Sequence, residues 1–260
     1  MKKLLLTTVL VSSAVLGFTG NVHANEQNKI TETPEKTDVG INFKTDGGST
    51  IGQGPFSDHL AIVFKPTKFD FGTEQEAIPF KKVYTEKVDA SNIKKNKYLI
   101  VNDDRKTAGS AVAGSPWHVT ATYSGLSEKG NASNTLESAL KIKLEPVQKY
   151  TIGTDKDPIT QDIKPNDPND PASNAITDFS GAEHGEFRLG ADLAANASAE
   201  VELSNTATTV FGRKEAATAI GTEGVATRIS ETNLTIEDGT GADGKTFVGS
   251  VTWQLADTYK

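Results

Sequence analysis

Short stretches in which apolar and polar residues alternate recur along most of the chain. Leu140–Leu144 alternates strictly, whereas 59–64 and 97–101 are apolar runs bounded by turn-forming residues. A period of two is typical of strands with one buried face, and short apolar runs between turns are typical of buried strands. Further short segments of this kind are 187–189, 201–203, 208–211 and 234–236. The pattern predicts an all-β fold, an antiparallel β-sandwich of immunoglobulin-like or related type with long loops.

Two segments have a more helical composition. They are 134–139 and 191–199, which are rich in alanine, leucine and glutamate or asparagine. We therefore expect one or two short helices in addition to the strands.

Residues 151–185 carry four prolines and many aspartates and asparagines, a composition that favours an extended loop. The acidic side chains offer oxygen ligands of the kind that calcium prefers. They are Asp155, Asp157, Asp162, Asp167 and Asp170. Because no register typical of a calcium loop is present, we predict a solvated acidic loop and no metal site, with calcium binding as the alternative.

The N-terminus has the organisation of an export signal. Lys2 and Lys3 precede an apolar run from Leu4 to Phe18, and 22–24 provide the small-x-small pattern of a cleavage site. We therefore predict a signal peptide over 1–24, a flexible polar leader over 25–40 and a single domain over 41–260. The run is too short for a membrane span, so we expect a secreted chain with no membrane segment in its mature form.

The net charge and the absence of cysteine exclude several classes of ligand and of chemical site. Residues 1–24 contain two lysines and no acid, so their removal lowers the formal net charge from −7 to −9. This acidic balance disfavours nucleic acid as a ligand. The chain contains no cysteine, which excludes disulfides, thiolate metal sites, cysteine nucleophiles and lipid anchors.

Both tryptophans lie in segments with the pattern of strands. In 115–123 one face carries Trp117, Val119, Ala121 and Tyr123, and the other carries His118, Thr120 and Thr122. In 247–255 one face carries Phe247, Gly249, Val251, Trp253 and Leu255. Each segment thus places a tryptophan and a branched aliphatic residue on one apolar face.

Two interpretations fit these faces. In the first, which we favour, both tryptophans anchor the core of the sandwich. In the second, the rings form a partly exposed platform that stacks on sugars or docks a partner. Both hold if the rings lie at the edge of the sandwich.

An exported, cysteine-free β protein with Trp117-His118-Val119 near its middle and Trp253-Gln254-Leu255 near its end resembles the WxL-domain cell-surface proteins of low-GC Gram-positive bacteria. Asp70-Phe71-Gly72 in the first third and Ser138-Ala139-Leu140 after the first motif are also similar to that family. The first motif departs from the pattern, with valine in place of leucine. The resemblance covers 40–260.

The resemblance implies non-covalent attachment to the cell wall through peptidoglycan and assembly with a WxL-interacting surface protein, and with other WxL proteins. It makes Trp117, His118, Val119, Trp253, Gln254 and Leu255 the candidate binding residues. No LPxTG-like sorting signal is present, which agrees with non-covalent attachment. Because wall polymers are anionic, we expect apolar and hydrogen-bonding contacts rather than charge attraction.

Motifs that would indicate an enzyme are weak. Gly239, Gly241 and Gly244 match the dinucleotide fingerprint by letters, but a strand follows them instead of a helix, so we predict a hairpin loop and no cofactor. His118 is expected at the surface or an interface. His184 lies between Glu183 and Glu186, a pair that could serve a glycosidase, but the sequence does not set their separation.

We therefore expect a non-catalytic surface protein. Two alternatives stay open. One is a secreted carbohydrate-active enzyme or accessory module with a site around Glu183–Glu186. The other is an adhesin for host matrix proteins, as members of the resembled family can be.

Overall fold

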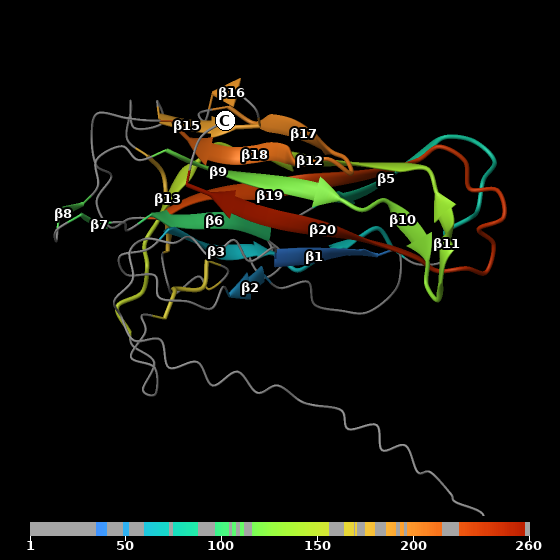
Figure 1. Ribbon diagram of the computed structural model, residues 1–260, viewed down its shortest axis with the longest axis horizontal. Coiled ribbons are helices and arrows are strands. Elements are labelled where there is room, and N and C mark those ends of the chain that lie inside the picture. Colours follow the sequence, from blue (N-terminus) through green and yellow to red (C-terminus); the bar gives the residue numbers. More distant parts are fainter. Residues whose placement is uncertain are drawn as a thin grey trace, which may run out of the picture.

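Two β-sheets stacked face to face make up the ordered body of this computed structural model (Figure 1). The structure describes residues 35–40, 49–51, 60–72, 75–87, 97–103, 106–107, 110–111, 116–155, 164–168, 170, 175–179, 186–190, 193–194, 197–214 and 224–257. The predicted all-β sandwich is confirmed. The predicted signal peptide over 1–24 lies outside the described residues.

The first sheet holds both tryptophan segments. Its described strands are β1 (Glu35–Gly40), β4 (Lys68–Asp70), β9 (Trp117–Tyr123), β10 (Leu126–Glu128), β11 (Asn131–Leu136), β15 (Phe187–Leu189), β16 (Leu193–Ala194), β18 (Thr208–Arg213) and β20 (Phe247–Ala256). They run in the order β11-β10-β20-β9-β18-β15-β16, with β1 paired to β20 and β4 paired to β1. Among the described pairings only β1 with β4 is parallel. Since β1 belongs to this sheet, the sheet begins before residue 41, within the segment predicted as a leader.

The second sheet is organised around one long strand. Its described strands are β2 (Ser49–Ile51), β3 (Leu60–Pro66), β5 (Lys82–Lys87), β6 (Lys97–Asp103), β12 (Ser138–Leu144), β13 (Gln148–Tyr150), β14 (Ile176–Thr177), β17 (Ala199–Leu203) and β19 (Gly224–Ile236). The first half of β19 pairs with β13 and β6, and its second half with β12 and β5. A separate ribbon joins β7 (Lys106–Thr107) to β8 (Ser110–Ala111).

The predicted helices are wrong. Residues 134–136 belong to β11 and 138–139 begin β12, while the described part of 191–199 contains β16 and the first residue of β17. Among the described residues there is no α-helix. Pairing with neighbouring strands overrides the helical preference of alanine and leucine here.

Side chains from both sheets fill the space between them. β12 shows the principle, because Leu140, Ile142 and Leu144 are buried while Lys141 and Lys143 between them are partly exposed. A second, smaller core lies on the outer face of the second sheet. It contains Val63, Phe64, Tyr98, Ile100, Tyr150, Ala175 and Ala226.

Part of the proline-rich segment covers this smaller core. The Tyr150 hydroxyl donates a hydrogen bond of 2.5 Å to the carbonyl of Asn166, and the Asn166 side-chain amide donates to the carbonyl of Thr151 at 2.9 Å. Ile152 and Ile176 pack against the cluster. The described part of 151–185 is mostly loop, as predicted, but β14 and these contacts attach it to the sheet.

Candidate functional site

The two tryptophan motifs lie on neighbouring strands in the middle of the first sheet. β20 pairs antiparallel with β9, and Leu255 lies directly opposite Val119. Trp253 lies opposite Ala121, so both tryptophans occupy the same face of the sheet. Two segments more than a hundred residues apart in sequence thus form one continuous structural unit.

Both rings lie inside the sandwich. Trp117 and Trp253 are each 0% exposed, and Val119 and Leu255 beside them are also buried. The Trp117 ring meets the Phe211 ring edge-on, with centroids 5.0 Å apart, and lies 6.4 Å from the Phe187 ring. The interpretation as core anchors is therefore confirmed, and the exposed aromatic platform is wrong.

The indole nitrogen of Trp117 is an exception in this well-packed interior. Nε1 is buried and has no hydrogen-bond acceptor. A buried donor without a partner costs free energy. The ring therefore contributes through its size and its aromatic contacts rather than through its N–H group.

The opposite face of the same strands is polar and uncharged. We call it the hydroxyl face; it consists of His118, Thr120, Thr122, Thr209, Ser250, Thr252 and Gln254. Gln254 and Thr209 flank Thr120 from the two neighbouring strands, and Thr252 lies opposite Thr122. All except His118 are partly exposed. The middle residues of both motifs, His118 and Gln254, therefore share this face.

His118 departs from the expectation of a surface residue, because it is only 5% exposed. Its position on the outer side of β9 follows the alternation, but alternation assigns a face and not an exposure. Gln254 is partly exposed. Of the six candidate binding residues, only Gln254 is therefore partly exposed to a ligand.

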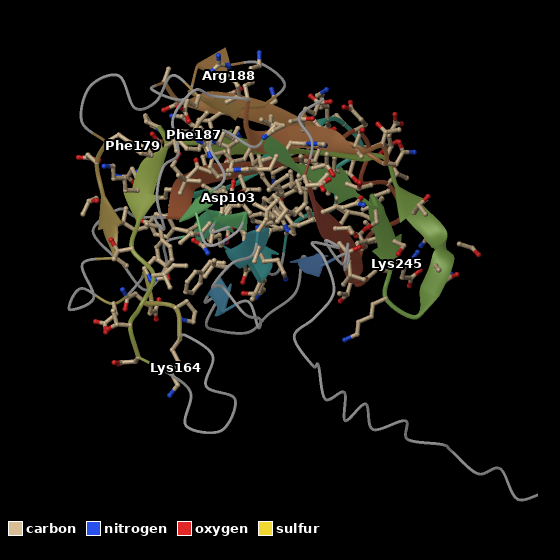
Figure 2. The ribbon with its side chains drawn as sticks, turned by 60° about the vertical axis from the view of Figure 1, so that its left-hand side comes forward. Asp103, Lys164, Phe179, Phe187, Arg188 and Lys245 are labelled. Atoms are coloured by element: carbon tan, nitrogen blue, oxygen red, sulfur yellow. The ribbon has the colours of Figure 1, made fainter. Side chains whose placement is uncertain are left out.

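A second cluster lies near the Trp117 end of the sandwich. Buried Arg213 follows Phe211 on β18, and its Nε and Nη2 donate to Glu186 Oε2 at 3.0 and 2.8 Å. Its Nη1 lies 3.7 Å from Asp103 Oδ2 at the end of β6. Arg213 thus links the two sheets electrostatically. Figure 2 shows Phe179 beside Phe187 in the same region, where their rings stack at 5.6 Å.

This geometry bears on the carbohydrate-active alternative. The carboxylate of Glu186 is engaged by Arg213, which is a structural role. Glu183 and His184 lie outside the described residues, as does His59. Nothing in the pattern of the sequence pointed to Arg213, because its two acidic partners are distant in sequence.

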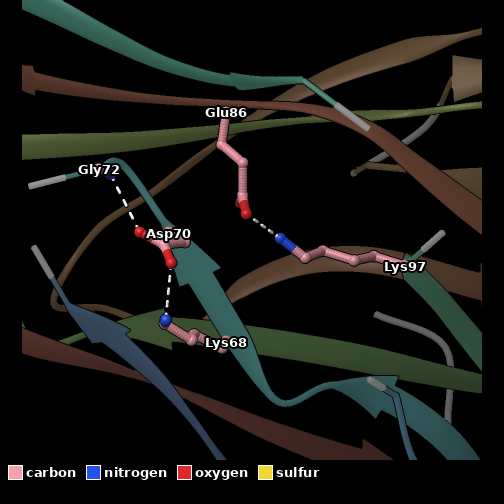
Figure 3. Close-up of polar contacts among 5 residues, drawn as sticks. All are labelled: Lys68, Asp70, Gly72, Glu86 and Lys97. Carbon is pink, nitrogen blue, oxygen red and sulfur yellow. Dashed lines mark hydrogen bonds and ion pairs between the residues drawn. The ribbon is translucent and has the colours of Figure 1, made fainter. Parts of the chain in front are cut away.

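A third polar cluster surrounds the Asp-Phe-Gly segment (Figure 3). Asp70 at the end of β4 accepts hydrogen bonds from Lys68 Nζ at 2.6 Å and from the backbone N–H of Gly72 at 3.0 Å. Gly72 has a φ of 88°, a conformation that favours glycine and explains this residue. Burial raises the pKa of Asp70, but the bonds from Lys68 and Gly72 outweigh it and hold that pKa below its usual value. Lys97 and Glu86 form a buried ion pair next to this turn.

The remaining sequence motifs are the glycine-rich segment and the acidic residues of the calcium alternative. The glycines at 239, 241 and 244 occupy a loop from β19 to β20, which belong to different sheets, so the predicted hairpin is wrong. Within the described residues no group of three or more histidine, aspartate or glutamate side chains could hold a metal ion. Asp157 and Asp162, which belong to the predicted calcium alternative, lie outside the described residues.

Comparisons with protein-family models, with curated proteins and with solved structures found no match. A search of the described residues for a helix of membrane-spanning length and apolarity found none. The site must therefore be judged on its own geometry.

Proposed function

We propose that this chain is an exported, non-catalytic surface protein that attaches non-covalently to the Gram-positive cell wall through peptidoglycan and assembles with a WxL-interacting partner. The observation that supports it best is the pairing of the two tryptophan motifs on adjacent strands. In the resembled family these motifs characterise the wall-binding domain. In this chain the two motifs lie side by side in one sheet, so their outward-facing residues belong to one surface.

We propose that the hydroxyl face makes the contact. The tryptophans are buried and hold the two strands in place, so their polar neighbours are what a ligand can reach. Hydroxyl and amide groups donate and accept hydrogen bonds, which suits the hydroxyls and amides of peptidoglycan. The named residues carry no formal charge, although β1 places Lys36 opposite Thr252 and Asp38 opposite Ser250 at the border of this face. Contacts by hydrogen bonds suit a chain whose formal net charge becomes −9 once residues 1–24 are removed and whose target is anionic.

The test is a pull-down on purified peptidoglycan sacculi, with and without the WxL-interacting partner. We compare the wild type with a triple variant, Thr120→Ala, Thr252→Ala and Gln254→Ala. The matched control is Thr85→Ala, Thr235→Ala and Asn233→Ala, which removes two threonines and one amide from the outward positions of the second sheet. Circular dichroism checks that both variants keep their β-structure.

We expect the hydroxyl-face variant to bind at least about tenfold more weakly and the control variant to bind like the wild type. Wild-type binding that requires the partner, and that the hydroxyl-face variant loses, would identify the hydroxyl face as the assembly surface. Equal binding by all three proteins would contradict the role of the hydroxyl face. Absence of binding by the wild type, with or without the partner, would contradict wall attachment itself.

A further inference from the structure

The ion pair between Lys97 and Glu86 is largely buried, as are the pairs of Arg213 with Asp103 and Glu186. Lys97 begins β6 and Glu86 lies near the end of β5, and both strands pair with the same side of β19. The side chains are only 5% and 16% exposed, and Nζ is in direct contact with Oε1 (Figure 3). By contrast, the pair between Lys81 and Glu237 is 63% and 39% exposed.

An aromatic ring and two further charges surround this pair, because the charge of Asp70 acts on both side chains and that of Lys68 acts on Lys97. Lys97 Nζ lies 5.2 Å from the centroid of the buried Phe69 ring. The backbone N–H of Asp70 donates a hydrogen bond to the Glu86 carboxylate. The other carboxylate oxygen, Oε2, is buried and has no hydrogen-bond partner. An ionised carboxylate with such an oxygen is poorly stabilised in this place.

Burial changes the protonation of both groups in a consistent direction. It lowers the pKa of the Lys97 amine and raises the pKa of the Glu86 carboxyl, and the attraction between the two charges only partly opposes this. The neutral amine and the neutral acid therefore gain population relative to the ion pair. A neutral amine is a nucleophile, and the hydroxyl group of a protonated carboxyl can depart as water.

We propose that Lys97 and Glu86 are joined by an amide bond in the folded protein. The lone pair of Nζ attacks Cδ of the protonated carboxyl group, the bond from Cδ to the hydroxyl oxygen breaks, and the nitrogen gives up a proton to the departing hydroxyl group. The products are one amide and one water molecule, so no oxidant or other reactant is required.

The contacts favour this outcome in three ways. The Asp70 N–H stabilises the negative charge that develops on the carboxyl oxygen during attack. The oxygen that departs as water leaves behind no unpaired buried acceptor. The amide also replaces two buried charges by a neutral group, which removes the cost of their desolvation.

The bond would connect the ends of β5 and β6 on either side of residues 88–96. A chain that is closed in this way has less conformational freedom in its unfolded state, so the folded state gains relative stability. For a protein that acts outside the cell, a covalent tie that needs no cysteine serves where a disulfide would serve in other secreted proteins.

Intact mass spectrometry of the purified, denatured full chain tests the proposal. We expect the mass to be lower than the sequence mass, after any signal cleavage, by one water molecule. Trypsin should then release 83–87 joined to 96–105, with no cleavage after Lys97 because its side chain is acylated. Lys97→Arg and Glu86→Ala should both show the full sequence mass, and the matched control Lys81→Arg should keep the loss of water.

The full sequence mass in folded wild-type protein after prolonged incubation would overturn the proposal. Loss of water with a cross-link mapped to other residues would overturn the assignment to this pair. If the Lys97 and Glu86 variants do not fold, the wild-type mass and its branched peptide still decide the question. Neither result depends on whether the chain binds peptidoglycan.

Discussion

Val119 and Leu255 are direct cross-strand neighbours in the pairing of β9 with β20. Each is the third residue of a tryptophan motif. The two motifs therefore lie side by side on antiparallel strands and share one buried face. The arrangement explains why an apolar residue is needed two positions after each tryptophan. It also places His118 and Gln254 together on the opposite face.

Substitution of either tryptophan should destabilise the fold before it affects any contact with a ligand. Because both rings are 0% exposed, we expect Trp117→Ala and Trp253→Ala to lower the free energy of unfolding by about 3–5 kcal/mol each. Gln254→Ala, on the outer face of β20, should lower it much less, because it removes no large buried side chain. Urea denaturation measures all three, and a tryptophan variant of wild-type stability would contradict the buried position.

Arg213 should be the most sensitive charged residue of the described sandwich. Arg213→Ala leaves Asp103 and Glu186 without their shared cation. We expect a loss of about 3 kcal/mol, at the low end for a broken buried pair because Glu186 is 21% exposed. Lys81→Ala, which breaks a solvent-exposed pair, should leave the stability nearly unchanged, because water screens that pair. Thermal unfolding of the two variants side by side tests this, and similar losses would argue against a link between the sheets.

Glu145 should contribute to the loss of stability in acid. Partial burial raises its pKa, but hydrogen bonds from Ser230 at 2.5 Å and Ser198 at 2.9 Å outweigh this and hold the pKa of Glu145 below its usual value. A carboxyl whose pKa is lower in the folded state stabilises the protein above its unfolded pKa, and this contribution is lost as the pH falls through the folded value. Glu145→Gln should therefore weaken the pH dependence of unfolding at acidic pH. An unchanged dependence would show that other carboxyls determine it.

Gly249 should not tolerate a side chain. A Cβ atom at this position would lie 2.4 Å from the carbonyl oxygen of Gly125 and 3.2 Å from the Tyr123 ring. We expect Gly249→Ala to cost about 1–3 kcal/mol through this overlap. Gly244→Ala provides the comparison, because φ is +68° there and nothing lies within 4 Å, so its cost is backbone strain alone. Crystal structures of both variants would show a shift of β20 only for Gly249→Ala.

Much of the strand pattern could be predicted from the sequence because it is local. The alternation over 138–144 and 247–255 reports which side chains share a face, and the buried positions of β12 and β20 agree with it. Local composition misled in 134–139, where alanine and leucine favour a helix in isolation. The segment instead forms β11 and β12, whose pairing with β10 and β19 a local pattern cannot reveal.

The sequence singled out Asp70 and Glu186, but the partners within the polar clusters could not be predicted. Lys97 stands at the start of an apolar run, and only the fold brings it against Glu86 and the Phe69 ring. Arg213 has no distinctive neighbours in sequence, and its partners come from both sheets. Charged side chains carry no periodic signal that names a partner, since the partner depends on how the strands are ordered.

The sequence by itself determined the all-β class, the faces of the strands and the special place of the two tryptophan motifs. Only the tertiary structure decided that these motifs pair with each other, that both rings are buried and that the hydroxyl face is what remains accessible. The physical reason is the nature of β-structure. The direction of a side chain follows from the pleat of its own strand, whereas the neighbour of a strand is chosen by hydrogen bonding and packing with segments far away in the chain.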